Sequence, residues 1–150
     1  MKKYINLILL ISWMIIIFMM SNAPSVESIN QSNFITNIIN KILNVKNIEL
    51  LDFIIRKLAH LFEYSVLGIL TINCLKEYRI KNIIVLSIIL CFIYACSDEI
   101  HQLFVVGRSG KFIDVIIDTS GAIIGVLVYN FIYNVLKKQK FRYCKFISEP

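Results

Sequence analysis

Residues 83–102 read IIVLSIILCFIYACSDEIHQ. The first fifteen of these residues carry no charge, and neither glycine nor proline separates them from the acidic and histidine residues that follow. A continuous run of this kind predicts one helix over residues 83–104, whose apolar part lies in a bilayer and whose polar end reaches the membrane surface.

Three further apolar runs flank this segment along the chain. They cover residues 4–20, 53–73 and 114–136, and each is long enough to cross a hydrocarbon core of about 30 Å. Because 57% of the 150 residues are hydrophobic and only 17% are charged, the chain is too apolar for an ordinary soluble domain of this size. We therefore predict an all-α fold, an integral membrane four-helix bundle that forms a single domain over residues 1–150.

The segment between the first two runs, residues 21–52, is more polar. Within it Ile35, Ile38, Ile39, Ile42 and Leu43 recur at the spacing of one helical face, while asparagines and a lysine occupy the opposite face. This pattern predicts a short interfacial amphipathic helix between spans one and two, lying on the membrane surface. A loop that packs one helical turn onto the bundle is the alternative.

Basic residues are unevenly distributed about the four runs. Ten flank the ends that we assign to one side of the membrane, and six flank the other side. The ten are Lys2, Lys3, Lys76, Arg79, Lys81, Lys137, Lys138, Lys140, Arg142 and Lys145, and the six are Lys41, Lys46, Arg56, Lys57, Arg108 and Lys111. The positive-inside rule then predicts that both termini are cytoplasmic. Since these cations flank apolar runs and form no separate basic face, we expect no nucleic-acid partner despite the net charge of +6.

The ionisable residues of the last three runs fall at one membrane depth, on the outer side. Steps of three or four residues place them on one face of each helix, so we expect the three faces to converge. The candidates for acid–base catalysis are His60, Glu63, Asp98 and His101. The candidates for ligand binding are Arg56, Lys57, Tyr64, Glu99, Gln102, Arg108, Asp114 and Asp118.

Glycines mark two further features of this region. Gly121 and Gly125 have the spacing that lets helix backbones approach closely in lipid. Gly107 and Gly110 bracket a basic and a hydroxyl residue, which predicts a turn between the last two spans. Backbone donors of this turn and the planar guanidinium of Arg108 suit a phosphate or a carboxylate.

Charged groups inside a membrane span each cost roughly 2.5 to 3.5 kcal/mol unless they are paired or hydrated. Four cations stand against five carboxylates here, so with neutral histidines the cluster has a net charge of minus one. Near-neutrality suits a network that holds three helices together. The alternatives are a metal site, acid–base catalysis with water activated by His60 or His101, and recognition of an anionic headgroup. Neighbouring cations oppose a metal and no cysteine contributes, so we predict neither a metal nor a cofactor.

Three motifs, in this order, are similar to those of the VanZ-like family of bacterial membrane proteins. They are RKLAHLFEY at 56–64, DEIHQ at 98–102, and GRSG at 107–110 followed by Asp114 and Gly121. With Phe18, Ser21 and Pro24 the resemblance covers residues 18–136. The chain departs from the pattern at Asp118, where the family usually has asparagine, and at Val106, where a proline often precedes the turn. An aspartate at 118 must be protonated or newly paired to replace a donating amide.

The resemblance implies a multi-pass protein of the bacterial cytoplasmic membrane. The family is named for a member associated with resistance to the lipoglycopeptide antibiotic teicoplanin. We expect the outward-facing polar site to meet membrane lipids, a lipid-linked cell-wall precursor or a lipoglycopeptide antibiotic, and to contribute to resistance without consuming the antibiotic. The alternative is an intramembrane enzyme that acts on a lipid or cell-wall-precursor headgroup.

Overall fold

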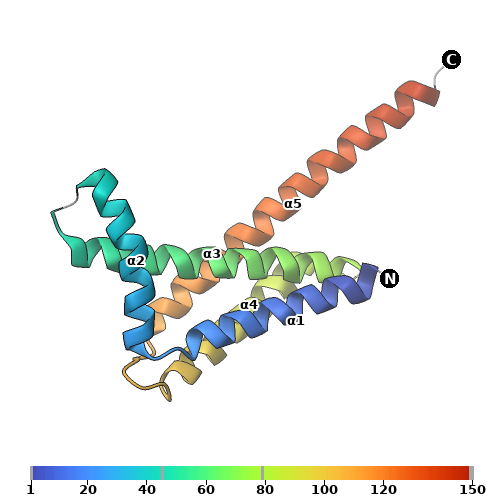
Figure 1. Ribbon diagram of the computed structural model, residues 1–150. Helices are drawn as coiled ribbons and strands as arrows, with labels where there is room; N and C mark the ends of the chain where they lie inside the picture. The colour runs from blue at the N-terminus through green and yellow to red at the C-terminus, as the bar shows by residue number, and fades with distance from the viewer. Residues whose placement is uncertain (1, 45, 79, 149–150) are drawn as a thin grey trace.

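The computed structural model describes residues 2–44, 46–78 and 80–148, with the side chains of 25–31, 43 and 141–148 left undescribed (Figure 1). These ranges form five helices: α1 (Lys2–Ser21), α2 (Ser25–Leu43), α3 (Ile48–Lys76), α4 (Ile83–Gln102) and α5 (Phe112–Ser148). No strand occurs within them. The predicted all-α fold is therefore confirmed.

Four of the helices are long and apolar enough to cross a membrane. They are α1, α3, α4 and the part of α5 from Phe112 to Lys140. All four expose large apolar side chains, such as Ile8, Phe62, Phe92 and Leu127, which would meet water in a soluble protein. This pattern fits a multi-pass membrane protein whose outer surface faces lipid.

The helix bounds differ in detail from the apolar runs. Helix α3 begins at Ile48, because the Asn47 side chain caps its first turn by accepting a hydrogen bond from the Leu50 amide at 3.1 Å. Helix α4 ends at Gln102, and Leu103 and Phe104 belong to the following turn. Helix α5 continues well past residue 136, and in Figure 1 its C-terminal half leaves the bundle.

Helix α3 lies at the centre of the molecule and packs against all four other helices. Its closest partner is α5, whose backbone approaches that of α3 at two glycines. A Cβ atom at Gly121 would collide with the Leu61 carbonyl, and one at Gly125 would collide with the Ser65 carbonyl. The Ser65 hydroxyl donates across this contact to the Gly121 carbonyl oxygen at 2.9 Å. The close backbone approach expected from the glycine spacing is thus present between α3 and α5.

Helix α2 runs across one end of the bundle in Figure 1. It buries Ser32 and Thr36, and the Thr36 hydroxyl donates to Asp52 Oδ1 of α3 at 3.3 Å. Ile35, Ile38 and Ile42 are exposed on the surface of the protein. The segment is thus a 19-residue helix and not a loop with a single turn. Its apolar side chains are available to lipid, while the predicted contribution of Leu43 lies outside the described side chains.

The connections α1–α2 and α4–α5 lie at the same end of the bundle as α2 (Figure 1). Arg108 joins them, because its Nη1 donates to the Ser21 carbonyl oxygen at 3.1 Å. Gly107 has a φ of 76°, a left-handed conformation that a side chain would strain. The predicted turn therefore brings Arg108 back over the end of α1.

Candidate functional site

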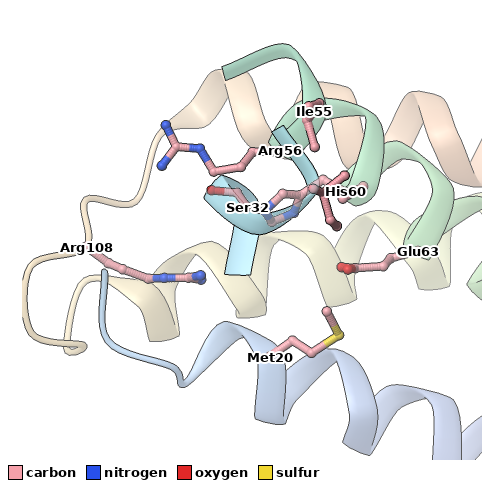
Figure 2. A pocket seen from close by; sticks show the side chains of 9 residues that line it. Met20, Ser32, Ile55, Arg56, His60, Glu63 and Arg108 are labelled. Atoms are coloured by element: carbon pink, nitrogen blue, oxygen red, sulfur yellow. The ribbon is translucent and has the colours of Figure 1, made fainter. Parts of the chain in front are cut away.

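The ionisable residues of α3 surround an open pocket of about 150 Å³ beneath α2. Its polar wall contains Arg56, His60, Glu63 and Arg108, and its apolar wall includes Met20 and the isoleucines at 35 and 55. In Figure 2, Glu63 and Arg108 point into this space from opposite sides, and Met20 lies below them. The pocket is therefore amphipathic, with charged groups on one side and side chains suited to an acyl chain on the other.

A second pocket of about 190 Å³ adjoins the first and shares Arg56, His60 and Arg108 with it. Lys57 and Lys111 also line it, together with Gly107 and Ser109 of the turn. Among the described residues that line this space, four carry cationic side chains and Asp114 is the single carboxylate. An electropositive concavity with backbone and guanidinium donors suits a phosphate or another small anion.

Two ion pairs hold these cations in place. Lys57 of α3 pairs with Asp114 of α5, and Arg56 Nη2 lies 3.1 Å from Asp52 Oδ2, one helical turn earlier on α3. The sequence reasoning missed Asp52, because it stands just before the apolar run at 53–73 and was assigned to the connecting segment. Its spacing of four residues from Arg56 was the available signal.

His60 stands between the pockets and the interior of the bundle. Its Nδ1 atom lies 3.4 Å from Asp118 Oδ1, and the Asp118 side chain is completely buried. Glu63 is one helical turn further along the same face of α3, and its backbone carbonyl accepts a hydrogen bond from Trp13 Nε1 at 3.0 Å. A histidine supported by a buried carboxylate is an arrangement that general bases use.

Four other predicted residues lie behind His60, out of the two pockets, whereas Gln102 lines the second pocket. Tyr64, Asp98, Glu99 and Asp118 are all 5% exposed or less. Gln102 Nε2 donates to Asp98 Oδ2 at 3.3 Å, and the Lys111 amide donates to Glu99 Oε2 at 2.8 Å. The faces of α3, α4 and α5 therefore come together in two layers, a basic outer layer and an acidic buried one.

His101 does not join this arrangement. Its ring lies 4.5 Å from that of Phe18, and its Nε2 atom is 3.2 Å from Asn22 Oδ1. Both partners belong to the end of α1 and the connection after it. His101 is on the face of α4 that packs against α1, whereas Asp98 and Gln102 turn inward.

Comparison with known proteins agrees with this architecture. The profile of the VanZ/LLP1 family matches residues 6–133, which is most of the chain and overlaps all four apolar runs. No curated protein and no solved structure matches the chain. The chain belongs to the VanZ/LLP1 family.

Proposed function

We propose that this protein binds the phosphate-bearing headgroup of a membrane lipid or lipid-linked cell-wall precursor at the outer face of the bacterial cytoplasmic membrane. The observation that carries the proposal is the junction of the two pockets, where an electropositive space of about 190 Å³ adjoins an amphipathic one of about 150 Å³. An anionic headgroup matches the first space, and the start of an acyl or polyprenyl chain matches the second.

The arrangement around the pockets supports a lipid over a soluble ligand. The amphipathic pocket is walled by Ile35 of α2 and Met20 of α1, which both belong to surfaces rich in exposed apolar side chains. A chain leaving this pocket would therefore meet apolar side chains and not water. The predicted orientation, with cytoplasmic termini, places the headgroup pocket on the envelope side.

The single tryptophan of the chain provides a direct assay, because Trp13 is hydrogen-bonded to Glu63 at the pocket wall. Titration of purified protein with short-chain phosphatidylglycerol or a polyprenyl phosphate should change Trp13 fluorescence, whereas diacylglycerol without phosphate should not. Arg56→Gln and Arg108→Gln should each weaken binding about tenfold or more, because each removes a charge-assisted contact.

Lys138→Gln serves as the matched control, since it removes a cation from the exposed far part of α5. It should bind like the wild type. Equal binding by all variants would contradict the proposed site. If inorganic phosphate alone bound as tightly as the lipids, the ligand would be a soluble anion and the lipid assignment would be wrong.

Binding of this kind would contribute to teicoplanin resistance without destroying the antibiotic. A membrane protein that engages precursor or lipid headgroups changes what a lipoglycopeptide meets at the membrane surface. Cells that express the protein should therefore tolerate more teicoplanin while the drug recovered from the culture is intact. Chemically modified teicoplanin, absent from cultures that lack the protein, would contradict this mechanism.

Hydrolysis of the same headgroup is the second candidate function, and the His60–Asp118 pair favours it. In that reaction His60 would take a proton from a water molecule that attacks phosphorus. The bond from phosphorus to the bridging oxygen would break, and the lipid oxygen that leaves would take up a proton from His60 or from water. Release of phosphate from a polyprenyl phosphate or diphosphate should then be lost in His60→Ala, even at lipid concentrations that saturate the weakened binding of this variant. Absence of any release by the wild type, in an assay where a known membrane phosphatase succeeds, would exclude this function.

A further inference from the structure

Three carboxylates meet in the buried layer behind His60. Asp98, Glu99 and Asp118 each offer one oxygen atom, and these atoms all lie within 4.8 Å of one another. The three residues are 4%, 5% and 0% exposed. Negative charges this close cannot remain uncompensated in an apolar bundle, so the cluster requires either protons or a cation.

Each carboxylate is supported by a neighbouring nitrogen and keeps at least one oxygen free. Gln102 holds Asp98, the Lys111 amide holds Glu99, and His60 Nδ1 lies beside Asp118. Asp98 Oδ1, Glu99 Oε1 and both oxygens of Asp118 have no hydrogen-bond partner. Metal-binding side chains are oriented in the same manner, by partners that fix one side and leave the other to the ion.

A hydroxyl group from a third helix points to the same place. Tyr64 of α3 is 0% exposed and its hydroxyl has no hydrogen-bond partner. The hydroxyl lies close enough to Asp98, Glu99 and Asp118 for the charge of each carboxylate to act on it. A buried hydroxyl without a partner costs on the order of a lost hydrogen bond, which a bound ion or its water would restore.

The size and chemistry of the cluster suit an oxygen-preferring divalent cation. Calcium binds oxygen at about 2.3 to 2.6 Å, so two of its ligands are separated by at most about 5 Å, and magnesium or manganese sites are slightly smaller. The separation of 4.8 Å or less fits within one coordination sphere. Two positive charges would leave a single negative charge on the cluster.

We propose that Asp98, Glu99 and Asp118 bind one divalent cation of the Ca²⁺, Mg²⁺ or Mn²⁺ class. This inference revises the expectation, drawn from sequence, that the neighbouring cations exclude a metal. The cations line the outer pockets, whereas the three carboxylates lie in the layer behind them. Glu99 also lines an open pocket of about 290 Å³ with Gly110 and Lys111, so one of the three proposed ligands borders a space at the surface.

The test uses full-length protein in lipid nanodiscs, stripped with EDTA and then dialysed against Ca²⁺, Mg²⁺ or Mn²⁺ in turn. Elemental analysis should find about one ion per chain for at least one of them, and the same ion should raise the melting temperature. Asp118→Asn and Asp98→Asn should lose both effects. Asp52→Asn is the matched control, because it removes a buried carboxylate outside the cluster and should retain the ion.

The wild-type result alone decides the proposal, even if a variant fails to fold. Absence of a bound ion and of a melting shift with all three cations would overturn it. A stripped protein that is stabilised by acid instead of by cations would also overturn it, because protons would then hold the carboxylates. These readouts involve no lipid titration, so they succeed or fail separately from headgroup binding.

Discussion

The two histidines of the chain, both candidates for catalysis, have different surroundings. His60 lines both pockets and lies next to a buried carboxylate, whereas His101 packs its ring against Phe18 of α1. Both are histidines spaced three residues from a carboxylate on the same helix, so the sequence does not distinguish them. Their different surroundings depend on which face of each helix packs against which neighbour. The structure therefore assigns the pocket to one histidine only.

Substitution of each histidine by glutamine should separate these positions. His60→Gln should weaken lipid-phosphate binding, measured by Trp13 fluorescence, by about tenfold, because a polar group at the junction of the pockets loses its ability to carry charge. His101→Gln should leave binding within about twofold and lower the free energy of unfolding by about 1 kcal/mol or less. The reverse ranking in the titration would show that the pocket is formed by other residues.

At the scale of elements, the contact between α3 and α5 determines the geometry of the site. It brings Lys57 to Asp114 and His60 to Asp118, so one helix pair provides both of these contacts. Glycines permit this approach by removing side chains from the contact. A change in helix separation would therefore alter both pairs at once.

A side chain placed in this contact should separate the two helices. Gly125→Val puts a Cβ against the Ser65 carbonyl oxygen, which is backbone and cannot move aside, so it should lower the free energy of unfolding by about 2 kcal/mol or more. The measurement is SDS-induced unfolding in mixed micelles. Val128→Phe enlarges an exposed side chain of the same helix and should change stability by less than about 0.5 kcal/mol. Equal effects would argue against close packing here.

Helix α2 presents polar side chains to the protein and apolar ones outward, which is the reverse of a helix on a soluble domain. We expect the outward side chains to enter the membrane surface. A spin label at Ile42→Cys should be more accessible to oxygen dissolved in lipid, and one at Lys41→Cys more accessible to a water-soluble relaxation agent. Both positions are exposed in the protein, so equal accessibility to the aqueous agent would place α2 in water.

At the scale of the whole molecule, the start of α1 and the end of α5 lie away from the end of the bundle that carries α2 and the pockets (Figure 1). The excess of lysine and arginine predicts which side is cytoplasmic, and the proposed function requires the pockets to face the envelope. The orientation is therefore a condition for headgroup binding at the outer surface.

Cysteine labelling tests the orientation directly. In a chain whose native cysteines are replaced, Ser109→Cys should react with a membrane-impermeant maleimide in intact spheroplasts. Lys138→Cys should react only after permeabilisation, because α5 carries it to the opposite side. Both residues are exposed, so access and not burial decides the result. The opposite pattern would place the pockets in the cytoplasm.

Composition and run length were sufficient for the overall architecture. Apolar runs of this length have few stable alternatives to a membrane helix, because every backbone amide in lipid must find a partner within the segment. The spacing of Gly121 and Gly125 also predicted a close contact between two helices. The interval of four residues between Asp52 and Arg56 is equally visible in the sequence, but Asp52 precedes the apolar run and so falls outside the predicted site.

The sequence by itself determined that four helices cross a membrane and that polar groups gather at one end, because hydropathy and helical periodicity are local properties. Only the tertiary structure decided the partners of those groups. Lys57 faces Asp114 and His60 faces Asp118 because two glycines let α3 and α5 approach, while His101 turns to α1. The tertiary structure also divided the polar cluster into a basic pocket and a buried acidic layer, because burial depends on how helices far apart in the chain pack together.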